Sequence, residues 1–77
     1  MHAMNVTQCR MARAGLGWSV ADLAKAAGLG ERTVAKFETG GNVQASTVET
    51  LRQALVRHGV EFINGGKSQG VKVPRRD

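Results

Sequence analysis

A short segment over residues 28–41, Gly-Leu-Gly-Glu-Arg-Thr-Val-Ala-Lys-Phe-Glu-Thr-Gly-Gly, holds side chains that suit the binding of a polar ligand. Its two turns of possible helix lie between glycines. At about 100° per residue, polar and apolar side chains of such a helix separate onto two faces. Val34 and Phe37 share the apolar face. The polar face carries Glu31, Arg32, Ala35 and Lys36. A helix held by its apolar face leaves the polar face free for hydrogen bonds and charge attraction.

The composition favours binding over catalysis. The 77 residues hold 11 Lys and Arg against 6 Asp and Glu, and the formal charge of +5 favours an anionic partner such as nucleic acid or an acidic surface. No carboxylate pair, metal-ligand cluster, phosphate loop or nucleophile with a neighbouring base stands at a usable spacing. We therefore expect one small domain that is not an enzyme and that uses no cofactor and no metal.

Cysteine usage and hydropathy bear on the location of the protein. The single cysteine, Cys9, cannot form an internal disulfide, which is simplest to reconcile with a reducing compartment. The N-terminal residues lack a basic region followed by a long apolar run, and no stretch approaches the 18 or so apolar residues of a membrane span. A cytoplasmic protein with no membrane association is expected.

Four helical patterns precede a tail of different character. Three pairs of residues spaced as capping boxes predict helix starts, namely Asn5 with Gln8, Ser19 with Asp22, and Ser46 with Glu49. Apolar residues recur at helical spacing after each pair. Gly15 and Gly17 are expected to end the first helix, Gly28 the second and Gly59 the fourth. The third helix is expected over about residues 30–38.

Beyond the fourth helix the period of the apolar residues changes to two. Apolar and polar residues alternate over 60–63 and 71–73, around a glycine-rich stretch, which is typical of two short strands. A lone two-stranded hairpin is marginal in water, so these strands must pack on the helices or pair with a second chain. The expected fold is mainly α, with a helical domain over 1–59, a strand pair over 60–73 and a flexible tail over 74–77.

The connection between the second and third helices is the most specific signal. Ala24, Gly28 and Val34 stand four and then six residues apart. A small Ala24 allows a second helix to cross closely, and Gly28 can adopt the left-handed conformation of a short turn between steeply crossed helices. Val34 and Phe37 then hold the third helix against the core. Over about residues 6–58, the pattern resembles the helix-turn-helix domain of the lambda-repressor-like regulators, the Cro or XRE family.

The resemblance implies that the third helix enters the major groove of double-stranded DNA. By position, the base-reading candidates are Glu31, Arg32, Thr33, Ala35 and Lys36. Arg32 is the strongest, because its guanidinium can donate to both O6 and N7 of a guanine. Lys36 could do the same or bind a phosphate. Glu31 could accept from a cytosine amino group or simply favour the helix dipole, and Ala35 could lie against a thymine methyl.

The resemblance also assigns roles outside the third helix. Arg13 and Glu38 occupy positions where this family often pairs an arginine with a glutamate across the core, which would fix the third helix on its scaffold. The family frequently has a DNA-contacting glutamine just after the N-cap of the second helix, but this chain has Val20 there. The candidates that replace this contact are Ser19, Asn42 and Gln44. Each of the three fits a role in capping or in a solvated loop equally well.

The sequence therefore predicts a small bacterial or phage-type transcriptional regulator, by preference a repressor, that binds double-stranded DNA sequence-specifically. A homodimer is expected, and no small-molecule ligand is evident. The family commonly closes its domain with a fifth helix, which the strands over 60–73 replace here, so this segment is the candidate dimer element. The alternative is a protein-interaction module, such as an antitoxin-like partner or an accessory adaptor, with a basic surface.

Overall fold

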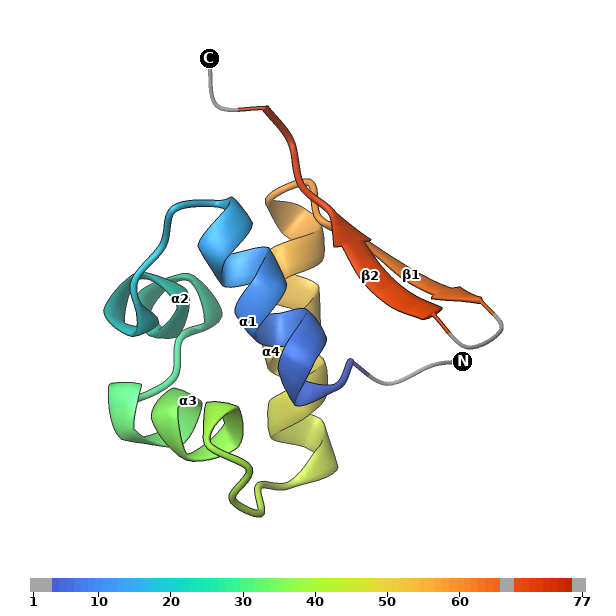
Figure 1. Ribbon diagram of the computed structural model, residues 1–77. Coiled ribbons are helices and arrows are strands. Elements are labelled where there is room, and N and C mark those ends of the chain that lie inside the picture. The colour runs from blue at the N-terminus through green and yellow to red at the C-terminus, as the bar shows by residue number, and fades with distance from the viewer. Residues whose placement is uncertain (1–3, 66–67, 76–77) are drawn as a thin grey trace.

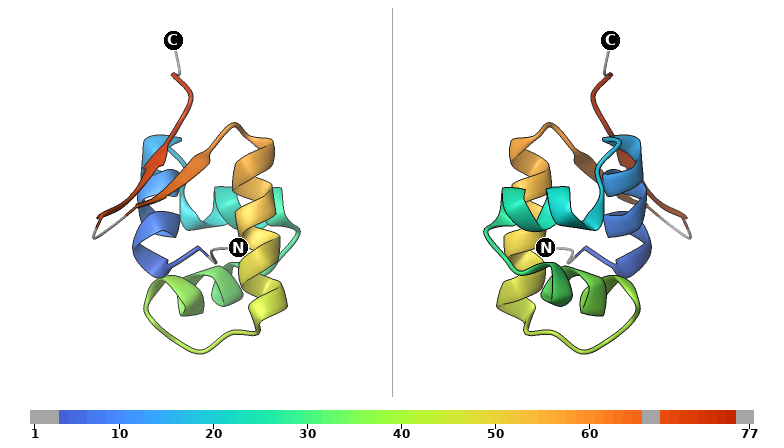
Figure 2. Two further views of the ribbon diagram at one scale, coloured as in Figure 1. Left: turned by 90° about the vertical axis from the view of Figure 1, so that its right-hand side faces the viewer. Right: turned by 90° about the vertical axis from the view of Figure 1, so that its left-hand side faces the viewer.

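Four helices and one two-stranded sheet build the part of the chain that the computed structural model describes, residues 4–65 and 68–75. In chain order they are α1 (Val6–Gly15), α2 (Val20–Ala27), α3 (Glu31–Glu38), α4 (Ala45–Arg57), β1 (Glu61–Gly65) and β2 (Ser68–Lys72). Figure 1 shows α2 and α3 on one side of the molecule and the strands on the other, and the two views in Figure 2 agree. The predicted fold class is confirmed.

Two of the three predicted capping boxes start their helices as expected. The Asn5 side chain accepts a hydrogen bond from the Gln8 N–H at 2.8 Å, and the Asn5 N–H donates to Gln8 Oε1 at 3.2 Å. Ser19 and Asp22 make the same reciprocal pair, at 3.1 and 2.8 Å. In both cases two backbone N–H groups that the helix itself cannot satisfy are paired locally.

The third predicted start is wrong. Helix α4 begins at Ala45 with Gln44 as its N-cap, two residues earlier than the Ser46 pattern indicates. Gln44 has extended backbone angles, φ −65° and ψ 148°, so the chain has already entered the helix at Ser46. Glu49 does not reach back to cap the helix, because its carboxylate accepts two hydrogen bonds from Arg52, at 2.9 and 2.7 Å. Such charge-assisted pairs are stronger than a neutral cap bond.

A glycine with positive φ follows each of the four helices, at Gly17, Gly28, Gly40 and Gly59. At the end of α2, the Gly28 N–H donates to the Lys25 carbonyl at 3.3 Å and the Leu29 N–H donates to the Ala24 carbonyl at 2.9 Å. This pair of bonds is the Schellman motif, which satisfies the last carbonyls of a helix and turns the chain away. At Gly28 it aims the chain from α2 into α3.

Replacing Gly28 by valine is expected to destabilise the fold by about 2 kcal/mol, because a left-handed conformation costs an L side chain about 1–2 kcal/mol and a β-branched one more. Gly28 has φ +69° and no atom within 4 Å of a Cβ placed on it, so the cost comes from the backbone alone. The midpoint of thermal unfolding should fall by about 8–16 °C. Gly30→Val is the control, since Gly30 has φ −75° and equally open space. Equal midpoints for the two variants would contradict the turn geometry.

The helices share one apolar core. Leu23 of α2 and Leu51 and Leu55 of α4 are fully buried, and burial of each such side chain contributes about 1.5–3 kcal/mol. Val34 of α3 is fully buried beside them, and Ala24 is buried in α2, which packs against α3. Within the described chain, none of the helices is both long and apolar enough to cross a membrane.

The two strands pair with each other and dock on their own helices. They run antiparallel, with Phe62 opposite Val71, and both of these side chains pack against the helical core. Gln8 of α1 is fully buried, and its Nε2 donates to the carbonyl of Ile63 in β1 at 3.3 Å and to that of Gly70 in β2 at 3.2 Å. Of the two arrangements left open by the sequence, the structure has the strands packed within one chain.

The residues after β2 cross the ends of two helices. A Cβ placed on Gly15, the last residue of α1, would lie 2.8 Å from Cγ2 of Val73. The valine can pack there because Gly15 has no side chain. Pro74 lies close to Gly59 after α4, with 3.1 Å between its Cγ and a Cβ placed there. The remainder of the expected tail, residues 76–77, and two residues of the expected glycine-rich turn, 66–67, lie outside the described residues.

Candidate nucleic-acid interface

Helix α3 has one buried and one free face. Val34 and Phe37 are buried in the core, and Thr33 at the margin is half-buried. The exposed face consists of Glu31, Arg32, Ala35 and Lys36. The structure thus brings together the four main base-reading candidates on one side of a helix of 8 residues.

The free face of α3 is predominantly cationic. Arg32 and Lys36 stand four residues apart, hence about 6 Å along the helix axis. Within residues 4–65 and 68–75, neither of them forms an ion pair. Their donors are therefore free for an external ligand. Glu31 lies in the first turn of the helix, where a negative side chain complements the positive end of the dipole.

A partly buried ion pair fixes α3 from behind. Arg13 of α1 holds Glu38, the last residue of α3, with Nε 2.9 Å from Oε2 and Nη2 2.9 Å from Oε1. Its Nη1 donates to the carbonyl of Trp18 at 3.0 Å, in the connection between α1 and α2. The side chains of Arg13 and Glu38 are 22% and 6% exposed. One guanidinium therefore ties α1 to α3, in the pairing that the resemblance implies, and also to the entrance of α2.

Cys9 lies beneath this ion pair as a core residue. It is fully buried, and its Sγ donates to Glu38 Oε2 at 3.5 Å. Burial, with a further contribution from the Glu38 carboxylate, raises the pKa of the Cys9 thiol to about 12. The thiol therefore stays protonated at neutral pH, and thiolate chemistry is not accessible to it.

The three candidates outside α3 occupy helix starts and a loop. The Ser19 hydroxyl already accepts the Asp22 N–H in its capping box but keeps its own proton for a ligand. Asn42 is exposed in the loop after α3, and Gln44 is the N-cap of α4, with its Oε1 3.4 Å from Ser46 Oγ. Val20 is half-buried against the core, so it offers no polar substitute for a glutamine.

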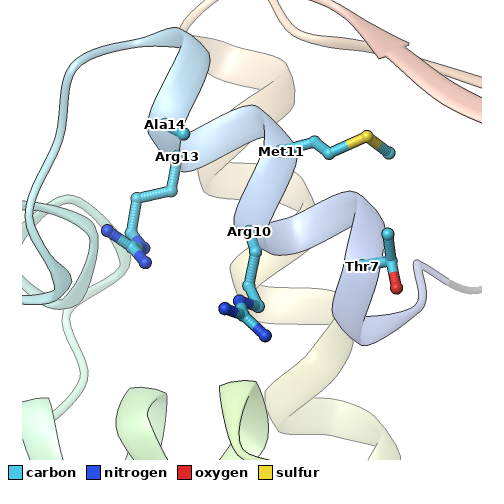
Figure 3. A pocket seen from close by; sticks show the side chains of 5 residues that line it. All are labelled: Thr7, Arg10, Met11, Arg13 and Ala14. Carbon is cyan, nitrogen blue, oxygen red and sulfur yellow. The ribbon is translucent and has the colours of Figure 1, made fainter.

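Arg10 is not among the site residues predicted from the sequence. It lines a shallow pocket of about 400 Å³ on α1, shown in Figure 3, together with Thr7, Met11, Arg13 and Ala14. The Arg10 and Arg13 side chains extend toward α3, whereas Met11 points toward the hairpin side (Figure 3). Arg10 is exposed and makes no ion pair within the described residues. Its spacing of three from Arg13 was the available signal, because such residues share one helix face.

Comparison with known families agrees with this geometry. Helices α2 and α3, joined at a left-handed glycine with the outer face of α3 free and basic, define a helix-turn-helix DNA-binding protein. A family model described as helix-turn-helix matches residues 10–62, more than half of the chain. The chain belongs to this Cro/C1-type helix-turn-helix family of lambda-repressor-like regulators, which bind double-stranded DNA. No curated protein matches the chain.

Proposed function

We propose that this protein is a sequence-specific transcriptional repressor of bacterial or phage type, which acts by occupying an operator with α3 in the major groove. The observation that carries the proposal is the free face of α3 on a helix whose back is fixed by the Arg13–Glu38 pair. Such a helix holds its backbone in one orientation, so little backbone conformational entropy is lost on binding. Operator DNA places the site of action in the cytoplasm of such cells.

In this proposal the exposed side chains divide between bases and backbone. Arg32 donates to O6 and N7 of a guanine, Glu31 accepts from a cytosine amino group and Ala35 lies against a thymine methyl. Exposed polar groups around α3 bind phosphates, which fix the position of the protein without reading sequence. The phosphate-binding set comprises Arg10, Ser19, Asn42 and Gln44. Thr33, half-buried, lies at the edge of the base-reading set.

The test is a fluorescence anisotropy titration of two duplexes across a series of salt concentrations. One duplex carries a site enriched by selection from random duplexes, and the other carries the same bases in scrambled order. Specific binding should exceed non-specific binding by a factor of about 10³ or more. The logarithm of the binding constant should fall with the logarithm of salt at about −0.9 per phosphate contacted. A protein-interaction module with a merely basic surface would show the same affinity for both duplexes, which would refute the proposal.

We also propose that the repressor binds as a homodimer through the outer face of its hairpin. Ile63, at the centre of that face, is 43% exposed and stands opposite Gly70, which has no side chain to cover it. Glu61 stands opposite Lys72 on the same face. In a two-fold pair, Ile63 of each copy can pack over the partner's glycine while the opposite charges match across the interface.

The position of this face suits two reading heads. The hairpin lies on the side of the molecule opposite α3 (Figures 1 and 2), in a fold with Cα extents of 31 × 29 × 18 Å. Joining two copies at their hairpins would leave α3 uncovered in both copies. To read paired half-sites, the pair would have to present both α3 helices on one face, about 34–36 Å apart.

Replacing Ile63 by lysine is expected to produce a monomer in sedimentation equilibrium. It should also remove the affinity gain of a two-half-site duplex over a single half-site. Two lysines facing each other near a two-fold axis repel, and the exposed apolar contact is lost. Val56→Lys is the matched control, because Val56 is 41% exposed but lies on α4. A variant at Ile63 that associates as the unmodified chain does would exclude this face as the interface.

A further inference from the structure

The loop after α3 folds back onto Lys36. Gly40 has φ +88°, and the Gly41 N–H then donates to the Lys36 carbonyl at 2.8 Å. A Cβ placed on Gly41 would lie 2.7 Å from Cγ of Lys36, 2.9 Å from its carbonyl oxygen and 3.4 Å from its Cε. The aliphatic part of the lysine therefore runs along the backbone of Gly41, and a side chain at this position would have to displace the lysine or shift the backbone.

This contact gives the lysine a direction. The Lys36 side chain lies against the loop at the C-terminal end of α3, whereas Arg32 lies in the first turn at the other end of the helix. In a helix-turn-helix protein the N-terminal residues of the reading helix contact base edges. An ammonium group carried toward the opposite end of the helix is carried away from those edges. A lysine is also a compact point charge, which suits a phosphate, and it lacks the fork that fits two acceptors of one base.

We propose that Lys36 is a phosphate ligand of the DNA backbone and not a base reader, and that Gly41 is the positioning residue that directs it. The proposal rests on the DNA-binding function above and assigns the direct reading of guanine to Arg32 alone. Asn42, exposed beside Gly41, can donate to the same phosphate from its side-chain amide.

A phosphate ligand and a base reader leave different signatures. Losing a phosphate contact weakens binding to every sequence by a similar factor and makes the salt slope less steep by about 0.9. Losing a base contact instead relaxes the preference at one base pair. The measurement is therefore a salt titration of the full chain on an enriched duplex and on its single-base variants.

We expect Lys36→Ala to weaken binding by about three- to tenfold per half-site on all of these duplexes, with the slope changed by about 0.9 for each half-site bound. The order of preference among the duplexes should stay the same. Arg75→Ala is the charge-matched control, because Arg75 is exposed and follows β2, a strand on the side of the molecule away from α3 (Figure 1), and it should leave both quantities unchanged. A changed preference at one base pair in Lys36→Ala would overturn the proposal and make Lys36 a base reader.

Gly41→Ala tests the positioning role by a double-mutant cycle. It should reproduce the slope change of Lys36→Ala, and it should add no further change in a chain that already carries Lys36→Ala. An unaltered slope, or equal costs in both backgrounds, would show that Gly41 does not act through the lysine. If Gly41→Ala does not melt as a folded protein, the slope and preference of Lys36→Ala decide the proposal. Absence of any sequence preference in the unmodified chain would refute the proposed function itself, which separates the two failures.

Discussion

Replacing Arg13 by methionine is expected to lower the free energy of unfolding by about 3 kcal/mol, the lower end of the range for breaking a buried ion pair. The lower end applies because the Arg13 side chain is 22% exposed. The variant leaves the Glu38 carboxylate, 6% exposed, without its guanidinium, and removes the donor to the Trp18 carbonyl. Unfolding by urea, followed by circular dichroism, measures the change.

Two further variants isolate the cause. The Glu49–Arg52 pair is shorter, at 2.7 Å against 2.9 Å, but its carboxylate is solvent-accessible, with side chains 45% and 23% exposed, so Arg52→Met should leave the unfolding midpoint nearly unchanged. Glu38→Gln placed in the Arg13→Met chain removes the uncompensated charge and should recover part of the loss. Equal effects of the Arg13 and Arg52 variants would show that the buried pair does not fix α3.

Replacing Arg32 by alanine is expected to weaken binding to the preferred operator by about 1–3 kcal/mol and to relax the preference at one base pair. Its side chain is exposed and makes no ion pair within the described chain, so the unfolding midpoint should not change. Arg10→Ala gives the comparison, because loss of a phosphate contact should weaken all duplexes alike. A preference matrix identical to that of the unmodified chain would remove Arg32 from the base-reading set.

The sequence predicted those features that neighbouring residues determine. Asn5 and Ser19 start their helices because the partner in each capping box stands three residues away. The turn at Gly28 could be predicted because this glycine stands between two segments with helical apolar periodicity. The free face of α3 could be predicted from the helical period alone. The prediction that Ser46 caps the fourth helix was wrong although it used the same local spacing. Its distance of three residues from Glu49 fits a capping box, but the helix already begins after Gln44.

Features that depend on distant contacts could not be predicted in this way. Gln8 serves as a capping residue, but its side-chain amide also binds carbonyls 55 and 62 residues further along the chain. No periodicity shows that partnership, so the docking of the hairpin remained one of two possibilities. Lys36 likewise looked free to read a base until the fold brought the backbone of Gly41 against its aliphatic chain.

Selection of binding sites from a pool of random duplexes by the purified chain is the most direct test of sequence-specific recognition by α3. We expect one enriched motif in which a guanine, read by Arg32, recurs at a fixed position. We further expect two inverted copies of this motif about one helical turn apart. A pool that stays random after repeated rounds, while the protein still binds duplex DNA through its positive charge, would contradict sequence-specific recognition by α3.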